Sequence, residues 1–233
     1  MDDIFSRTEM LIGSSGLERL QNSKVTVVGI GGVGSYTAEA LARSGIGDIT
    51  IIDSDKIDKT NINRQIHANV CTIGLAKVDV MSRRMLAINP DINIKTHYGE
   101  YNRNFPELIS ADCDYVIDAI DTISSKIDLV IQCKQMSIPI ISSMGAGNKL
   151  DPTKFKVGDI FETHTDPIAR IMRRRLKDLN IDRLKVVWSA EKPIVYKQDG
   201  TRVPSSIAFV PSVVGLIMAG EVIKDLIGWE SSN

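Results

Sequence analysis

A glycine-rich turn lies between a β-branched run and a helical run near the N-terminus, and this unit constrains the fold more than any other feature of the chain. Residues 24–30 read KVTVVGI, which is typical of a buried strand, and further glycines follow at once. Apolar residues then recur at helical spacing until Gly45, which ends the helix. The unit predicts an α/β fold in which backbone N–H groups and a helix N-terminus face a phosphate.

Four glycines and one carboxylate form the predicted nucleotide-binding pattern, namely Gly29, Gly31, Gly32, Gly34 and Asp53. Asp53 lies 19 residues beyond Gly34, in the second buried run DITIIDSD, where a carboxylate can accept hydrogen bonds from ribose hydroxyls. An alternative is that the glycines serve only tight packing of strand against helix, and that Asp53 caps a turn. The pattern favours a nucleotide but does not identify it.

The rest of the chain continues to alternate strand-like and helix-like segments. Strands are expected at 92–100, 115–121 and 139–145, and helices at about 74–90 and 123–136. After residue 151 the chain changes to short strands, a basic helix in 166–180 and an apolar closing helix in 211–228. We therefore expect a doubly wound, mainly parallel, Rossmann-like α/β sheet, with a C-terminal extension of short strands and helices. Within one domain, 1–150 would be the nucleotide-binding core and 151–233 the substrate-binding extension.

A polar segment, NINRQ, follows the Asp53 strand and does not fit a simple dinucleotide site. Asn61, Arg64 and Gln65 share one face if this segment forms a helical turn, and Lys77 begins the next helix. A guanidinium and an ammonium beside a phosphate loop suit a triphosphate, because they neutralise charge as the α-phosphate is attacked. The alternative is that Arg64 and Lys77 are solvated surface residues.

Two carboxylates end the predicted strand VIDAID at the same carboxyl edge of the sheet, where doubly wound folds bind ligands. Mg²⁺ takes one or two carboxylates together with phosphate oxygens. Of Asp118 and Asp121, Asp121 is the better candidate metal ligand, since it lies nearer the strand end. It could also cap the helix that follows.

Composition limits the other classes of function. The chain of 233 residues is 43% hydrophobic and has a net charge of −1, and no stretch approaches 18 uninterrupted apolar residues. The N-terminus lacks a basic start with an apolar run, so we expect a cytoplasmic protein without a membrane span. Cys71, Cys113 and Cys133 are too widely spaced for a C-x-x-C zinc pair, and we expect them to be small, partly buried hydrophobic residues.

Positive charge is concentrated in one segment. Seven basic residues and two acidic ones lie between Arg170 and Lys185. Such a stripe can bind phosphates in a salt-dependent way, or it can be a solvated helix face.

Together, GIGGVG, Asp53, NINRQ, Lys77, DAIDT and the early RTEMLIG resemble the superfamily of ubiquitin-activating enzymes and bacterial adenylyltransferases. The resemblance implies that a carboxylate attacks the α-phosphate of ATP to give an acyl adenylate and pyrophosphate. It implies that Gly29 to Gly34 hold phosphates, Asp53 the ribose, and Asn61, Arg64 and Lys77 the triphosphate, while Asp121 binds magnesium. Gln65 is also expected in the nucleotide site. Arg7 is similar to an arginine that reaches into the partner protomer's site, which implies a homodimer.

Three further stretches resemble the tRNA-modifying dehydratases of this superfamily: NRQIHA with TIGLAKVDVM, GAGNKLDPTKFKVGDI followed by DPIARIMRRRLK, and VVWSAEKP. Those enzymes use ATP to convert the threonylcarbamoyl group beside the tRNA anticodon into its cyclic form. The resemblance implies that Arg170, Arg173, Arg174 and Lys177 contact tRNA. Converting a carboxylate to an adenylate makes AMP the leaving group, and intramolecular attack then closes the ring without an enzyme thiol.

Two alternatives remain open from the sequence. The first is adenylation of the C-terminal glycine of a sulfur-carrier protein, although no cysteine follows Cys133 to supply a zinc pair or a downstream thiol. The second is a nucleotide-sensing module without turnover. A sulfur-relay or redox partner protein, and the role of His67 as general base or structural residue, also stay open.

Overall fold

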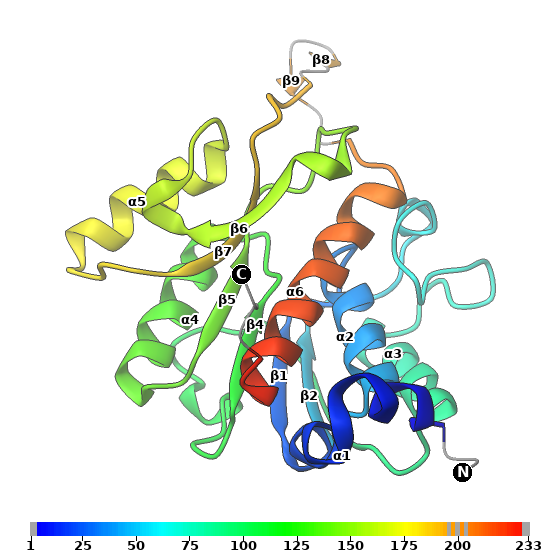
Figure 1. The fold of residues 1–233 in the computed structure, drawn as a ribbon. Helices are drawn as coiled ribbons and strands as arrows, with labels where there is room; N and C mark the ends of the chain where they lie inside the picture. The colour runs from blue at the N-terminus through cyan, green and yellow to red at the C-terminus, as the bar shows by residue number, and fades with distance from the viewer. Residues whose placement is uncertain (1–3, 195–196, 199–200, 203–204, 230–233) are drawn as a thin grey trace.

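The computed structural model describes residues 4–194, 197–198, 201–202 and 205–229, and its centre is a seven-stranded sheet (Figure 1). The strand order is β3-β2-β1-β4-β5-β7-β6. Every neighbouring pair is parallel except β6 and β7, which are antiparallel. The strands are β1 Lys24–Val28, β2 Asp48–Asp53, β3 Asn93–Tyr98, β4 Tyr115–Asp118, β5 Ile140–Ser143, β6 Phe155–Asp159 and β7 Lys185–Ser189. The predicted doubly wound, mainly parallel sheet is therefore confirmed.

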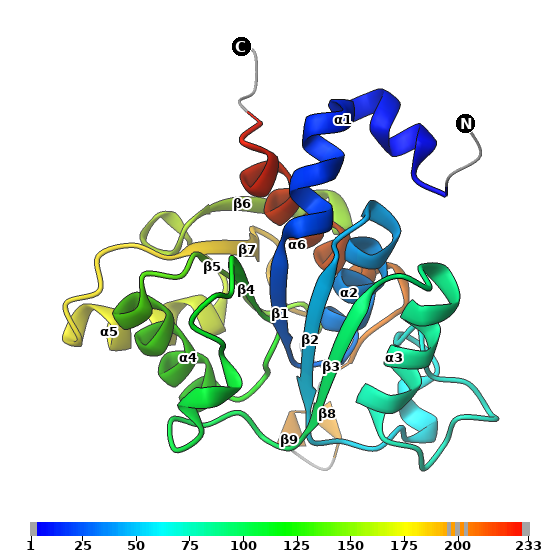
Figure 2. The same ribbon diagram turned by 90° about the horizontal axis from the view of Figure 1, so that it is seen from below.

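Helices cover both faces of this sheet (Figures 1 and 2). The long helices are α1 Ser6–Asn22, α2 Gly34–Ser44, α3 Lys77–Ile88, α4 Ile123–Met136, α5 Pro167–Asp178 and α6 Phe209–Ile227. Helices α1, α2, α3 and α6 share one apolar core, whereas α4 and α5 pack into a second core on the opposite face. The short helices are η1 Lys59–Asn61, η2 Pro106–Leu108, η3 Pro152–Lys154 and η4 Ile160–Glu162, and β8 Lys197–Gln198 pairs with β9 Thr201–Arg202.

The direction of winding reverses between β1 and β4. From β1 the chain proceeds to β2 and β3 on one side, whereas β4 leads to β5 on the other. The loops that leave neighbouring strands at such a point diverge to opposite faces and open a crevice at the carboxyl edge of the sheet. The loop after β1 contains the glycine turn, and the loop after β4 leads to Asp121. The fold thus brings the two predicted site segments together.

Local sequence accounts for where several helices begin and end. Gly45, with φ of 93°, terminates α2 in the left-handed conformation that glycine favours. Asp166 caps α5 by accepting hydrogen bonds from the backbone N–H groups of Ile168, at 2.9 Å, and Ala169, at 3.1 Å. The closing helix α6 begins at Phe209, so that Pro211 lies in its first turn, where a missing N–H costs little.

Some predicted boundaries were wrong. Strand β4 ends at Asp118, three residues before the expected end at 121, because residues 119–121 turn against the glycine loop. The segment after 151 supplies the expected short strands and helices, of which β6 and β7 join the main sheet and α6 packs on α2. No helix among the described residues is long and apolar enough to cross a membrane.

Candidate active site

Two of the four predicted glycines are required by packing. A Cβ added at Gly29, whose φ is 91°, would lie 2.6 Å from the carbonyl oxygen of Ala119. A Cβ added at Gly34 would lie 1.8 Å from the carbonyl oxygen of Gly29. Neither position tolerates a side chain, so the interpretation of tight strand–helix packing holds for these two glycines.

The other two glycines border the NINRQ segment. The nearest atom to a Cβ built on Gly31 is Nε2 of Gln65, at 3.9 Å. A Cβ built on Gly32 would lie 3.4 Å from Cγ of Arg64 and 3.1 Å from Cβ of Pro211. The bare backbone of Gly31 and Gly32 therefore faces the predicted triphosphate residues, and the structure brings these two groups together.

Asp53 is fixed at the end of β2 by two backbone donors. Its Oδ2 accepts a hydrogen bond from the N–H of Ile30 at 2.6 Å, and its Oδ1 accepts one from the N–H of Asp55 at 2.8 Å. Burial raises the pKa of Asp53, while the charge of Lys77 and these two donors oppose the rise. Each carboxylate oxygen keeps a second lone pair that a ribose hydroxyl could use.

Lys77 is buried at the start of α3, although it is charged. Only 5% of the residue is exposed, and its Nζ lies 2.6 Å from Oδ2 of Asp55 and 3.8 Å from Oδ1 of Asp53. The interpretation of Lys77 as a solvated surface residue is therefore wrong. Lys77 lies beside two carboxylates, at the end of the strand next to the one that leads into the glycine turn. Its ammonium group can therefore turn towards a phosphate bound at that turn.

The NINRQ segment forms the expected helical turn. The backbone N–H groups of Arg64 and Gln65 both donate to the carbonyl oxygen of Asn61, at 3.1 Å and 3.0 Å. Asn61 is buried, and its Oδ1 accepts from the N–H of Asp58 at 3.0 Å, so it has a structural role in capping η1. Arg64 is half-buried, and its NH1 donates to the carbonyl oxygen of Thr60 at 2.8 Å.

Gln65 and His67 hold buried polar atoms that have no hydrogen-bond partner among the described residues. These atoms are Oε1 of Gln65 and both ring nitrogens of His67. Buried polar atoms are seldom left unpaired, so a ligand or water is expected beside them. Burial, with the nearby charges of Lys77 and Arg84, lowers the pKa of His67 to about 4. His67 is thus a neutral imidazole near neutral pH.

Asp118 and Asp121 differ sharply in environment. Asp118 is fully buried, and its Oδ2 lies 3.0 Å from Nζ of Lys126 and accepts a 2.5 Å hydrogen bond from Oγ of Ser142. Asp121 is exposed, and the hydrogen bond recorded for its carboxylate is a long one, 3.4 Å, from Oγ1 of Thr122. Asp121 therefore has oxygens available for a cation, whereas the oxygens of Asp118 are already engaged.

The alternative role for Asp121 as a helix cap is wrong. The N-cap residue of α4 is Thr122, and no side chain of the described residues caps this helix. In the part of the chain that the structure describes, no group of three or more His, Cys, Asp or Glu residues could hold a metal. A cation bound by Asp121 would thus need oxygens from a phosphate or water, as Mg²⁺ does in nucleotide sites.

Arg7 lies at the opposite edge of the sheet from this crevice. The side chain of Phe5, two residues earlier, lies 3.6 Å from a Cβ built on Gly45, at the far end of α2 from the glycine turn. Since α2 has 11 residues, that distance is about 16 Å at 1.5 Å per residue. In Figure 1, α1, which carries Arg7 and leads directly into the start of β1, lies at the bottom of the molecule. Arg7 therefore does not reach the site of its own protomer.

The predicted tRNA-binding residues on α5 are not equivalent. Arg170, Arg174 and Lys177 are exposed. Arg173 is half-buried, and its NH1 donates to the carbonyl oxygen of Thr163 at 2.7 Å. In the same basic stripe, Nζ of Lys185 lies 2.8 Å from Oε2 of Glu221 and 2.9 Å from Oδ2 of Asp225. The stripe thus offers fewer free cations than its sequence suggests.

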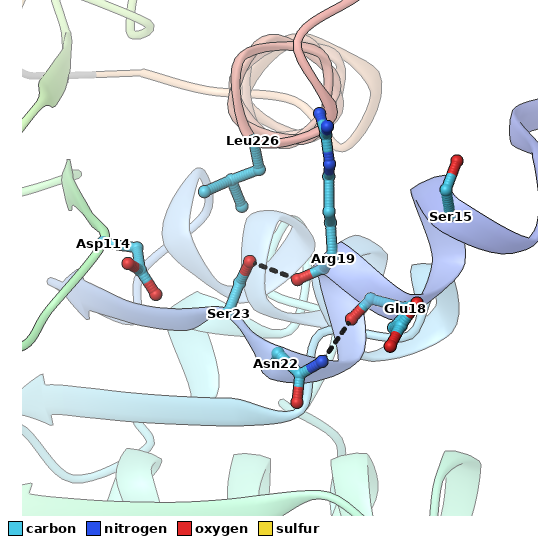
Figure 3. A pocket seen from close by; sticks show the side chains of 7 residues that line it. All are labelled: Ser15, Glu18, Arg19, Asn22, Ser23, Asp114 and Leu226. Carbon is cyan, nitrogen blue, oxygen red and sulfur yellow. Dashed lines mark hydrogen bonds between the residues drawn. The ribbon is translucent and has the colours of Figure 1, made fainter.

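One hollow bordered by described residues lies away from the predicted site residues. It has a volume of about 440 Å³ and is bordered by α1, Asp114 and Leu226 (Figure 3). Several of its polar groups are bonded locally: Arg19 NH1 donates to the carbonyl oxygen of Ile227 at 2.8 Å, and Asn22 Nδ2 to that of Glu18 at 2.9 Å. Because β1 starts beside it, this hollow is at the amino edge of the sheet, opposite the glycine turn.

The cysteines are free but differ in exposure. Cys113 and Cys133 are buried, as expected, whereas Cys71 is exposed, so the expectation of burial was wrong for Cys71. Burial raises the pKa of the Cys133 thiol to about 12 and also raises that of Cys113. These two thiols are therefore protonated and are not nucleophiles at neutral pH.

With this geometry established, comparison with known proteins defines the class. The chain belongs to the ThiF family, whose model matches residues 5–233. Within this class, the chain is 48% identical to the tRNA threonylcarbamoyladenosine dehydratase of Bacillus subtilis, over 96% of this chain and 94% of that protein.

Solved structures agree with this similarity. The crystal structure of the E. coli tRNA N6-threonylcarbamoyladenosine dehydratase with AMP superposes with a TM-score of 0.90 at 36% identity, covering 96% of this chain and 94% of that one. The structure of the same E. coli protein with ATP gives a TM-score of 0.89 at 35% identity, over 96% and 93% of the two chains. The resemblance inferred from the sequence motifs is thereby confirmed.

Proposed function

We propose that this protein is an ATP-dependent dehydratase that cyclises the threonylcarbamoyl group of threonylcarbamoyladenosine in tRNA. The observation that supports the proposal most is the meeting of the glycine turn, the NINRQ turn and Lys77 at one edge of the sheet, in a chain 48% identical to a protein of that name. The reaction would release AMP and pyrophosphate. It needs no electron donor, because no atom changes oxidation state.

ATP would lie along the carboxyl ends of β2 and β1. Asp53 would accept hydrogen bonds from the ribose, and the backbone of Gly31 and Gly32 would approach the phosphates. Arg64 and Lys77 would stabilise the negative charge that develops as the substrate carboxylate attacks the α-phosphate. Supporting this, Arg64 Cγ lies 3.4 Å from a Cβ built on Gly32, and Lys77 Nζ lies 3.8 Å from Asp53.

Asn61 and Gln65 would complete the nucleotide site in different ways. Asn61 holds the turn through its bond to Asp58, so its contribution would be mainly positional. Gln65 has a buried Oε1 without a partner among the described residues, and this oxygen could accept a hydrogen bond from the nucleotide or from a bound water.

Magnesium would be held by Asp121, with phosphate oxygens and water as its other ligands. The fit rests on the exposed carboxylate of Asp121 and on the lack of a complete protein cage among the described residues. When bound, the ion would add positive charge beside the phosphates. The residues of the chain would still orient the nucleotide and hold it against the glycine turn.

Ring closure would follow by attack within the substrate. The carbamoyl group attacks the carbonyl carbon of the acyl adenylate, AMP leaves with its bond electrons, and the attacking group loses its proton to solvent. A neighbouring group has a high effective concentration, so no covalent enzyme intermediate is required. The raised pKa values of Cys113 and Cys133 agree with this scheme. They also disfavour a mechanism in which a thiol of the sheet core accepts the acyl group.

A homodimer would complete the site. Arg7 lies at the amino edge of the sheet, about one helix length from its own glycine turn, so it could act only in a partner's site. Apolar side chains near it are exposed, including Met10 at 75% and Leu11 at 86%. Exposed apolar groups close together on one helix support the proposal that this helix contacts a partner protomer.

The tRNA would contact α5 through Arg170, Arg174 and Lys177, which are exposed, while Arg173 holds α5 to the preceding turn. A cytoplasmic location would match this substrate. The chemistry requires no sulfur-relay or redox partner. Two alternatives are less favoured: adenylation of a carrier protein, and nucleotide sensing without turnover.

A single incubation tests the proposal. The purified protein is mixed with ATP, Mg²⁺ and tRNA bearing the threonylcarbamoyl group. The tRNA is then digested to nucleosides, whose masses are measured by mass spectrometry. We expect a mass loss of one water, with AMP and pyrophosphate formed in equal amounts. Unchanged nucleoside, together with ATP–pyrophosphate exchange that depends on a small ubiquitin-like protein, would instead support carrier-protein adenylation.

A further inference from the structure

A smaller hollow opens on the other side of the glycine turn from Asp53. It has a volume of about 240 Å³ and lies between the loop after β5 and the segment that leads into α6. We call it the acceptor pocket and define it by Asn148, Leu150, Ile194, Ser205, Ser206 and Ile207.

The rim of the acceptor pocket is apolar. Leu150 is 54% exposed, Ile194 47% and Ile207 40%, and these three side chains come from separate segments of the chain. Large apolar side chains that converge on a hollow while remaining exposed indicate a surface that a ligand covers. Enzymes that act on a nucleobase hold it between apolar or aromatic side chains, and the aliphatic rim can supply such a contact.

The polar part of the pocket is held rigidly by Asn148. Its Oδ1 accepts hydrogen bonds from the N–H of Ser205 at 2.7 Å and the Oγ of Ser205 at 2.8 Å. Its backbone N–H donates to the carbonyl oxygen of Ser205, and its carbonyl oxygen accepts from the N–H of Ile194, both at 2.7 Å. Asn148 adopts a φ of 61°, which asparagine tolerates better than most residues. Its side-chain Nδ2 is a further donor that a ligand could use.

Lys149, which also lines the pocket, adds no free charge to it. Its Nζ donates to the carbonyl oxygen of Gly145 and lies 3.4 Å from Asp166, and both charged side chains are buried. Asp166 is the N-cap of the basic helix α5. The pocket is therefore close to neutral and is anchored to the helix proposed to contact tRNA.

The pocket adjoins the proposed site of adenylation. Nδ2 of Asn63, in the NINRQ segment, donates to the carbonyl oxygen of Ser206 at 3.0 Å. Five residues later, Pro211 lies 3.1 Å from a Cβ built on Gly32. In the strand order, the pocket loop follows β5 and Asp53 ends β2, with β1 and β4 between them. At about 4.8 Å per strand, the carboxyl ends of β5 and β2 lie roughly 14 Å apart, on either side of the glycine turn.

We propose that the acceptor pocket binds the purine base whose side chain bears the carboxylate to be activated. This inference rests on the proposed function. With ribose on the β2 side and phosphates at the glycine turn, the acceptor enters from the β5 side. The volume of about 240 Å³ is below the roughly 300–1,000 Å³ of pockets for whole ligands, and it suits one base with part of its side chain. Enzymes that act on a base commonly take it out of the stack into such a pocket.

Substitutions at the rim test the inference. Ile207→Ser and Leu150→Ser remove apolar surface from exposed positions, so folding should be preserved. The matched control is Leu86→Ser, since Leu86 is 43% exposed on α3, which borders neither the pocket nor α5. We expect each rim variant to lower kcat/KM for modified tRNA about tenfold or more, the factor that corresponds to about 1.4 kcal/mol of lost contact. The Kd for ATP and filter binding of unmodified tRNA should be unchanged, and the control should match the wild type.

The outcomes separate this inference from the proposed function. If the wild type dehydrates modified tRNA and the rim variants do so equally well, the acceptor pocket is wrong. It is also wrong if the rim variants lose ATP affinity in parallel, because the hollow would then belong to the nucleotide site. If the wild type is inactive, the proposed function fails. Calorimetric titration of free threonylcarbamoyladenosine would still decide the pocket, since Ile207→Ser should weaken binding and Leu86→Ser should not.

Discussion

Nζ of Lys126 lies 3.0 Å from Oδ2 of Asp118, and both side chains are almost fully buried at the centre of the crevice. The pair fixes the backbone on both sides of Ile120, because Lys126 Nζ also donates to the carbonyl oxygen of Ile120 at 3.0 Å and Asp118 Oδ1 accepts from the N–H of Ile120 at 3.1 Å. Ile120 precedes Asp121 and follows Ala119, whose carbonyl abuts Gly29. The buried pair therefore positions the proposed metal ligand relative to the glycine turn.

Removing only the cation of this pair should destabilise the protein strongly. We expect Lys126→Met to lower the free energy of unfolding by about 3–5 kcal/mol, because it leaves the Asp118 carboxylate buried without its partner. The double variant Lys126→Met with Asp118→Asn should recover much of that loss, since no charge remains buried. Urea denaturation measures both effects. Equal stability of Lys126→Met and the wild type would show that the pair has no such role.

His67 should make stability depend on pH between about 6.5 and 4. Its pKa is about 4 in the folded protein, against about 6.5 in the unfolded chain, so the unfolded state binds the proton first as pH falls. The stability that the neutral imidazole preserves is fully present above pH 6.5 and is lost as the pH falls. The loss in the free energy of unfolding reaches about 2–3 kcal/mol by pH 4.5. His67→Leu should show a correspondingly smaller loss between pH 7 and 4.5 in chemical denaturation. Parallel pH profiles for the two proteins would contradict this assignment.

The exposed and the anchored arginines of α5 should behave differently. Arg170→Ala combined with Arg174→Ala should weaken binding of modified and unmodified tRNA alike, and should reduce the salt dependence of log Kd by about 0.7–0.9 per lost phosphate contact. Arg173→Ala should mainly lower the thermal unfolding temperature, because Arg173 bonds the carbonyl of Thr163. Filter binding across a salt series, with melting curves, compares them. A salt slope unchanged by the double substitution would argue against tRNA contact by this helix.

Subunit mixing tests the position of Arg7. We expect Arg7→Ala and Lys77→Ala each to be nearly inactive alone, since loss of one charge-stabilising group costs roughly 10²–10³ in rate. If Arg7 acts in the partner's site, mixing the two variants should restore activity, because the heterodimer contains one site with both residues intact. Steady-state rates after subunit exchange measure this. Rates that stay at the level of the separate variants would place Arg7 outside the partner's site.

Local patterns in the sequence predicted most of the scaffold. The alternation of β-branched and helical runs predicted the sheet, and α4 was placed at the bounds that it has in the structure, because its apolar spacing is regular. The kink of α1 at Gly13, with φ of 76°, left no comparable signal, since a single glycine is compatible with a helix, a turn or a loop.

Charge pairing was much harder to predict. Lys126 and Lys149 are ordinary polar residues in the sequence, and only the tertiary structure places them on Asp118 and Asp166. For the same reason, the sequence placed Arg173 and Lys185 among the free cations of the basic stripe, whereas both pair with other groups of the fold. Residue spacing predicts which side chains share a helix face, but not which distant carboxylate each cation meets.

The most direct test of the central claim follows oxygen from the substrate carboxylate. The threonylcarbamoyl carboxylate of the tRNA is labelled with ¹⁸O, and the products formed with ATP and Mg²⁺ are analysed by mass spectrometry. Attack on the α-phosphate predicts that one labelled oxygen appears in AMP and the other stays in the cyclic nucleoside. Unlabelled AMP, or label in inorganic phosphate accompanied by ADP, would contradict an acyl-adenylate mechanism.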